Sequence, residues 1–140
     1  MRVLLIEDHP DILLICRLNL ELSGHEVLEA SDGEQGMELA LSLQPDIIVL
    51  DLMLPRQDGM STLREFQMRQ ETQDIPVVLL TAKAQRDDQI RGWESGCAGY
   101  ITKPFSPPEL TELLAEIHAM SVEDRSRRKG QALAGLREDG

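Results

Sequence analysis

The sequence predicts an α/β fold, in which a doubly wound parallel sheet is covered by helices on both faces. Short apolar runs of strand length alternate with longer segments that place apolar residues at helical spacing, five of each. Three of the runs contain no polar residue, which is typical of strands buried on both faces of a sheet. Alternation of this kind requires right-handed crossover connections, and these produce a parallel sheet.

The first half of the chain is predicted to contain two strands and two helices. The first strand covers residues 2–6, and Pro10 opens a helix over residues 10–22, because proline at the first helical position loses no hydrogen bond. Residues 26–29 form a weaker strand with only two apolar residues, which favours an edge of the sheet. A helix follows over residues 33–43.

The second half begins with the strand around which the chain is organised, residues 46–51, which is followed by a Pro/Gly turn cluster at residues 55–59. The next elements are predicted at residues 60–71, 77–81, 85–94 and 100–102. A last helix opens at Ser106 with a capping box and ends near residue 119. Beyond it the apolar periodicity fades. Residues 120–140 are therefore predicted to be a polar, basic tail, either a solvated helix extension or a linker, with only a faint helical pattern near Leu133.

Size, charge and cysteine content narrow the class of function. The 140 residues correspond to one domain. Lys and Arg number 14 against 25 Asp and Glu, so direct nucleic acid binding by residues 1–119 is not expected. The two cysteines follow no metal or disulfide pattern, and no apolar stretch approaches the roughly 20 residues that span a bilayer. We expect a cytoplasmic protein that does not contact membranes.

Chemically complementary residues follow four of the predicted strands. Glu7 and Asp8 follow the first strand and Asp51 the third, while Thr81 and Lys103 stand at the ends of the last two. Parallel strands end at one edge of a sheet, where open α/β folds bind their ligands. Carboxylates about 4 Å apart repel by about 4 kcal/mol at an effective dielectric of 20, so a divalent cation would explain why they gather there.

This set of residues suits phosphoryl transfer. Asp51 can accept a phosphoryl group as a mixed anhydride, while the acids hold Mg²⁺ and Lys103 and Thr81 contact phosphoryl oxygens. Each residue alone has an ordinary explanation as a helix cap, a strand end or a surface amine. The conjunction at four strand ends favours the functional interpretation.

The residues and their order resemble the receiver domains of two-component response regulators. The resemblance covers residues 1–119 and is carried by Glu7-Asp8, Asp51 within the run IVLDLMLP, Asp58-Gly59, Thr81-Ala82, and Tyr100 to Phe105 in the run YITKPF. It implies a flavodoxin-like (βα)5 fold with strand order 2-1-3-4-5. It also implies a cis peptide bond between Lys103 and Pro104.

The resemblance further implies a Mg²⁺-dependent transfer to Asp51 from a sensor histidine kinase or a phosphotransfer protein. The ion would be held by Asp8, Asp51 and the backbone carbonyl of Met53, with Glu7 acting directly or through water. The domain would catalyse only its own phosphorylation and dephosphorylation, so it is not an enzyme that acts on a separate substrate.

By the same resemblance, Thr81 and Tyr100 act as the switch, and the surface carrying residues 85–119 signals to a downstream output protein or domain. A phosphorylation-dependent dimer is one form of output. However, Glu112 and Glu116 stand where receivers that dimerise through this surface and drive DNA-binding domains carry basic residues.

Two alternatives remain open. The sequence shows no output motif, which favours a stand-alone receiver, but the chain could be the receiver half of a longer DNA-binding transcriptional response regulator. An aspartate-nucleophile phosphatase would belong to a different class. Such enzymes need a second aspartate two positions after the nucleophile, where this chain has Met53.

Overall fold

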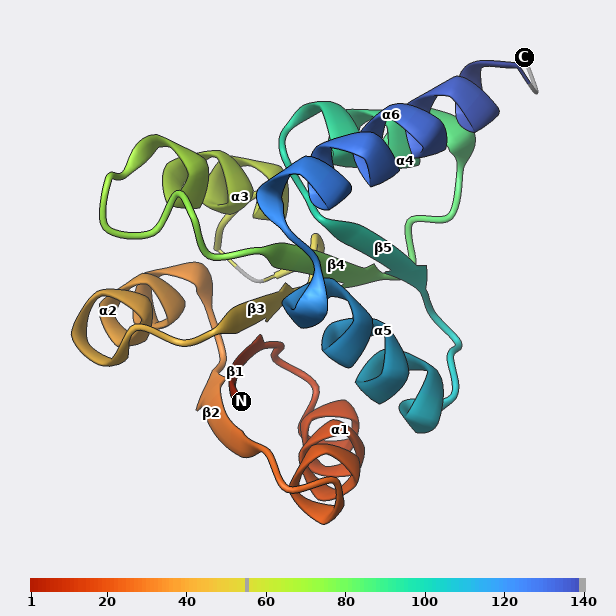
Figure 1. Ribbon diagram of the computed structural model, residues 1–140. Helices are drawn as coiled ribbons and strands as arrows, with labels where there is room; N and C mark the ends of the chain where they lie inside the picture. The colour runs from red at the N-terminus through yellow and green to blue at the C-terminus, as the bar shows by residue number, and fades with distance from the viewer. Residues whose placement is uncertain (55, 139–140) are drawn as a thin grey trace.

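The predicted doubly wound sheet is confirmed by a computed structural model that describes residues 1–54 and 56–138. Five parallel strands pair in the order β2-β1-β3-β4-β5, as the family resemblance implies (Figure 1). The strands are β1 (Arg2–Ile6), β2 (Glu26–Ala30), β3 (Ile47–Leu50), β4 (Val77–Thr81) and β5 (Gly99–Thr102). The weakly apolar β2 lies at an edge of the sheet, as predicted.

Helices cover both faces of the sheet, because successive residues of each strand point to opposite sides. They are α1 (Pro10–Leu22), α2 (Gly33–Leu43), α3 (Gly59–Met68), α4 (Arg86–Glu94), α5 (Pro107–Ala119) and α6 (Val122–Glu138). One aliphatic core joins the sheet to α1 and α5, and a second joins it to α2, α3 and α4. None of the described helices is long and apolar enough to cross a bilayer.

The largest differences from the sequence predictions lie at the end of α3 and after α5. Helix α3 ends at Met68 and not at residue 71, because the chain turns there and the buried Thr72 hydroxyl donates to the carbonyl of Phe66 at 2.7 Å. Residues 122–138 form a helix, α6, that packs against α4.

Cys16 and Cys97 are buried and free, in agreement with the absence of a disulfide pattern. Pro55, part of the predicted turn cluster, lies outside the described residues.

Candidate functional site

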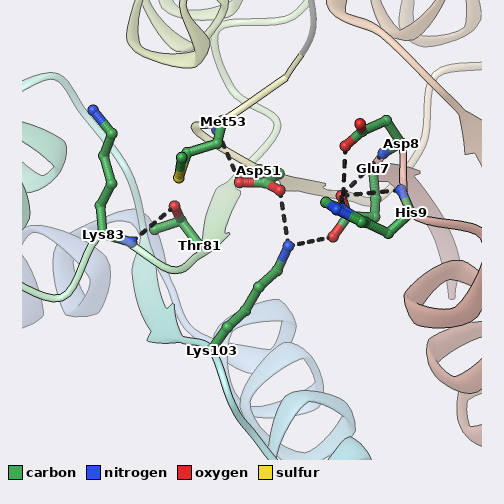
Figure 2. Close-up of polar contacts among 8 residues, drawn as sticks. All are labelled: Glu7, Asp8, His9, Asp51, Met53, Thr81, Lys83 and Lys103. Atoms are coloured by element: carbon green, nitrogen blue, oxygen red, sulfur yellow. Dashed lines mark hydrogen bonds and ion pairs between the residues drawn. The ribbon is translucent and has the colours of Figure 1, made fainter.

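The residues singled out at the strand ends meet at the carboxyl edge of the sheet (Figure 2). Glu7 follows β1, Asp51 follows β3, Thr81 ends β4 and Lys103 follows β5. The central strand pairings, β1 with β3 and β3 with β4, place Glu7 and Asp51 side by side above a core of aliphatic residues. The topology alone therefore gathers side chains that lie up to 96 positions apart in the sequence.

Lys103 is shared by two buried carboxylates. Its Nζ lies 2.5 Å from Glu7 Oε1 and 2.8 Å from Asp51 Oδ2, and these two acidic side chains are only 5% and 2% exposed. Burial lowers the pKa of Lys103, but the hydrogen bonds that its ammonium donates to Asp51 and Glu7 outweigh this effect and leave the pKa raised. The lysine is therefore a permanent cation between two acids. The peptide bond that follows it, to Pro104, is cis as expected.

Glu7 has a perturbed pKa. Burial is the main cause, and it raises the pKa of the Glu7 carboxyl above 4.5 together with the nearby Asp51, although Lys103 acts in the opposite direction. Its other oxygen, Oε2, accepts from the backbone N–H of Asp8 at 2.9 Å and lies 3.3 Å from His9 Nδ1. Glu7 is thus fixed at both oxygens.

Asp8 completes an acidic cluster that could hold a metal ion. Its Oδ1 is buried and has no hydrogen-bond partner among the described residues, although His9 Nδ1 lies 3.4 Å away. Glu7, Asp8, His9 and Asp51 each offer a ligand atom, and these atoms all lie within 4.8 Å of one another. A buried acidic oxygen without a partner and two further carboxylates are suitable ligands for a hard divalent cation.

His9 was not predicted as a site residue. Because Pro10 opens α1 directly after it, His9 stands at the N-cap position, and its ring turns back toward Glu7 and Asp8. The only signal in the sequence is its place next to the acid pair. A histidine at that position is equally compatible with a solvent-exposed helix start, so the sequence does not single it out.

The loop after Asp51 is held close to the carboxylate. The backbone N–H of Met53 donates to Asp51 Oδ1 at 2.9 Å, while Met53 as a whole is 54% exposed. Gly59 opens α3 and packs on this loop so tightly that a Cβ there would lie 2.4 Å from Leu52 Cα and 2.8 Å from the carbonyl oxygen of Asp51. The glycine is therefore required by the close approach of two backbone segments.

Thr81 lies at the same edge of the sheet but its hydroxyl is turned to Lys83. Thr81 is fully buried, and its Oγ1 accepts from the backbone N–H of Lys83 at 3.2 Å. The hydroxyl of Tyr100 donates to the carbonyl oxygen of the same Lys83 at 2.6 Å. Burial and the charge of Asp88 raise the pKa of the Tyr100 phenol, so this hydroxyl remains a neutral donor. Lys83 therefore links Thr81 to Tyr100 through its two backbone groups.

Comparison with known proteins defines the class. Residues 3–115 match the family described as the response regulator receiver domain, and this chain belongs to that family.

Two curated relatives are named as transcriptional regulators. The chain is 44% identical over 119 residues to the DNA-binding dual master transcriptional regulator RpaA of Synechocystis, which covers 85% of this chain and 48% of that protein. It is 38% identical to the alkaline phosphatase synthesis transcriptional regulatory protein PhoP of Bacillus subtilis, over 96% of this chain and 58% of that protein. The chain thus spans about half the length of the curated relatives it matches.

Solved structures of receiver domains have the same fold. The receiver domain of the sensor histidine kinase PA1611 from Pseudomonas aeruginosa, described with a magnesium ion in its active-site cleft, aligns with a TM-score of 0.78 at 30% identity, over 85% of this chain and 98% of that chain. The BeF3-activated N-terminal receiver domain of RstA from Klebsiella pneumoniae aligns with a TM-score of 0.79 at 27% identity, over 86% of this chain and 100% of that chain.

Proposed function

We propose that this receiver domain works as a phosphoryl-accepting switch in a two-component system. In this proposal Asp51 accepts a phosphoryl group from a sensor histidine kinase or a phosphotransfer protein. The observation that carries the proposal is the environment of Asp51, a buried carboxylate 2.8 Å from the Lys103 amine and within one cluster with Glu7 and Asp8. The expected place of action is the cytoplasm, where response regulators of this family operate.

The transfer needs only the Asp51 carboxylate as nucleophile. One carboxylate oxygen attacks phosphorus, the bond between phosphorus and the donor's nitrogen or oxygen breaks, and the leaving group keeps the electron pair. The product is an acyl phosphate on Asp51. Lys103 already contacts Oδ2, so its ammonium is placed to pair with a phosphoryl oxygen. Attack of water on phosphorus later restores Asp51 and releases inorganic phosphate.

The acidic cluster fits Mg²⁺, because the unpartnered Asp8 Oδ1 and the neighbouring carboxylates supply hard oxygen ligands. We assign the ion to Asp8, Asp51 and the backbone carbonyl of Met53, with Glu7 contacting it directly or through water. When bound, Mg²⁺ supplies positive charge that stabilises the transferring phosphoryl group. The magnesium described in the PA1611 receiver domain supports this choice of ion.

The same geometry supports Thr81 and Tyr100 as the switch. Phosphorylation adds acceptor oxygens at Asp51, and these draw the Thr81 hydroxyl away from Lys83. Tyr100, which is hydrogen-bonded to Lys83, then turns toward the space that Thr81 leaves. The change reaches the surface formed by α4, β5 and α5, to which we assign the downstream output and any phosphorylation-dependent dimer.

A second candidate places the same switch inside a longer protein. The curated relatives are named as transcriptional regulators, and the chain spans about half of their length. In that case, residues 1–119 form the receiver and residues 120–138 lead toward a DNA-binding domain that makes the nucleic acid contacts. A phosphatase that turns over separate substrates is disfavoured, because Met53 has no proton to donate to a leaving group.

Intact-protein mass spectrometry with a small acyl phosphate tests the proposal. We expect a gain of one phosphoryl group in the presence of Mg²⁺ and little gain in its absence. Asp51→Asn should abolish the gain. Asp74→Asn is the matched control, because Asp74 is exposed and remote in the sequence from the cluster, and it should behave as the original chain does. No gain under any condition would refute the proposal.

A further inference from the structure

Helix α6 covers one end of the proposed output surface. It lies across α4 (Figure 1). Leu133 is only 9% exposed and belongs to the same apolar cluster as Trp93 of α4 and Cys97 before β5. Ala132 and Leu136 pack against this cluster from the same side of α6. An otherwise polar helix is therefore docked through a short apolar stripe.

Ion pairs orient α6 with respect to both helices of the surface. Arg137 lies 3.6 Å from Glu94 of α4, and Arg128 lies 3.7 Å from Glu116 of α5. Glu116 is one of the acids that stand where related dimerising receivers carry basic residues. In this chain Glu116 pairs with Arg128 of the same molecule. The negative charge of Glu116 therefore favours intramolecular docking of α6.

Tyr100 lies at the boundary between α6 and the rest of the domain. Its ring packs beside Gly92, where a Cβ would lie 3.0 Å from Tyr100 Cε2, and it lines a groove with Trp93, Ala132 and Leu136. The hydroxyl of Tyr100 is bound to Lys83, whose N–H is bound to Thr81. Hydrogen bonds thus connect Thr81 to Tyr100, and the Tyr100 ring lines the same groove as the inner side of α6.

We propose that α6 is an intramolecular cover of the α4–β5–α5 surface, and that its docking depends on the position of Tyr100. This inference rests on the proposed function, because modification of Asp51 is what would move Thr81 and then Tyr100. When the ring turns inward, the groove under Leu136 loses one wall, α6 detaches, and the surface becomes available to a partner. Coupling of this kind is reciprocal: if phosphorylation weakens docking, docking also disfavours phosphorylation.

The unmodified protein provides the first test. Leu133→Asp places a charge in the apolar contact, whereas Ala134→Asp places the same charge on the exposed side of the same helix. Measured by hydrogen–deuterium exchange of the full chain, Leu133→Asp should speed exchange in residues 86–94 and 122–138 about fivefold or more, the lower end of usual couplings. Ala134→Asp should match the original chain. Equal exchange in both variants would refute docking through Leu133.

A charge-reversal pair tests docking without disturbing the apolar core. Arg128→Glu should speed exchange in residues 122–138 because it faces Glu116, and the double variant Arg128→Glu with Glu116→Arg should restore slow exchange. Both ion-pair partners are at least 30% exposed, so neither substitution is expected to unfold the domain. Absence of rescue would argue against the contact between α6 and α5.

Modification provides the decisive test of the switch. With Mg²⁺ and a small acyl phosphate, exchange in residues 122–138 should rise about fivefold or more, and Leu133→Asp should gain its phosphoryl group faster than Ala134→Asp. A normal phosphoryl gain with unchanged exchange in α6 would overturn this inference and leave the proposed function intact. No phosphoryl gain in any variant would overturn both.

Discussion

Replacement of Lys103 by methionine should destabilise the domain in a way that depends on pH. The substitution keeps an unbranched side chain but removes the only cation between Glu7 and Asp51 among the described residues. Removing one partner of a buried ion pair costs about 3–5 kcal/mol. With a urea m-value of about 2 kcal/mol per molar, the midpoint of unfolding at pH 7.5 should fall by roughly 2 M.

The sign of the pH dependence follows from Glu7. Burial already raises its pKa above 4.5 in the folded state, and loss of Lys103 removes the hydrogen bond that opposes this rise. The folded variant therefore keeps a proton on Glu7 at pH values where the unfolded chain has released it, so its stability falls as the pH rises. The stability deficit relative to the original chain should therefore be greatest near neutral pH and shrink as the pH is lowered to 5.

Urea unfolding at pH 7.5 and pH 5, followed by circular dichroism, measures both effects. Lys83→Met is the matched control, because Lys83 is exposed and its substitution should change stability by no more than about 0.5 kcal/mol. Added Mg²⁺ should recover more stability in Lys103→Met than in the control, since the ion replaces the missing charge. A deficit that is absent at pH 7.5, or that grows on acidification, would refute the electrostatic argument.

Two further predictions concern the loop after Asp51. Gly59→Ala should lower the free energy of unfolding by about 1–3 kcal/mol, because the added Cβ would lie 2.4 Å from Leu52 Cα. The control is Gly135→Ala, whose Cβ would have no described atom within 4 Å and which should be neutral or stabilising. Equal stability of the two variants in urea unfolding would contradict this prediction. Met53→Asn should change the dephosphorylation rate, because the exposed Met53 adjoins Asp51 and is placed to control the access of water to the phosphoryl group. An unchanged rate of phosphoryl loss, followed by intact mass, would reject this role of Met53.

Most of the fold could be predicted from the sequence because each central strand is a continuous apolar run closed by a turn or helix signal. The observed β1 and β4 coincide with the predicted ranges, and α5 begins at the capping box, where Ser106 Oγ accepts from the N–H of Glu109 at 3.3 Å. The end of α3 could not be predicted. It depends on a hydrogen bond from Thr72 to Phe66, which is specified by the turn and not by residue type.

The sequence pattern predicts helix α6 only weakly, for an energetic reason. Leu133 is its only buried residue among those described, so the helix has almost no apolar periodicity of its own and depends on its contact with α4. Its start is fixed locally, since Ser121 Oγ accepts from the N–H of Asp124 at 3.0 Å. A helix of this kind is stabilised mainly by the surface on which it docks. The sequence pattern of the helix itself does not reveal that surface.

The gathering of the candidate residues at one edge of the sheet was predictable, but the contacts that join them were not. Glu7, Asp8, Asp51 and Lys103 are brought together by parallel strand ends, a general property of this sheet topology. The connection from Thr81 to Tyr100 passes through the backbone N–H and carbonyl of Lys83. Backbone groups carry no sequence signature, so this link could be found only in three dimensions.

The most direct test of the central claim is to locate the phosphoryl group after reaction with a small acyl phosphate and Mg²⁺. Borohydride converts an aspartyl phosphate into homoserine, which peptide mass mapping can assign to one position. We predict homoserine at position 51, with little formed when Mg²⁺ is removed and none when Lys103 is replaced by methionine. Label at another residue, or none on a protein that remains folded, would contradict the assignment of Asp51 as the phosphoryl acceptor.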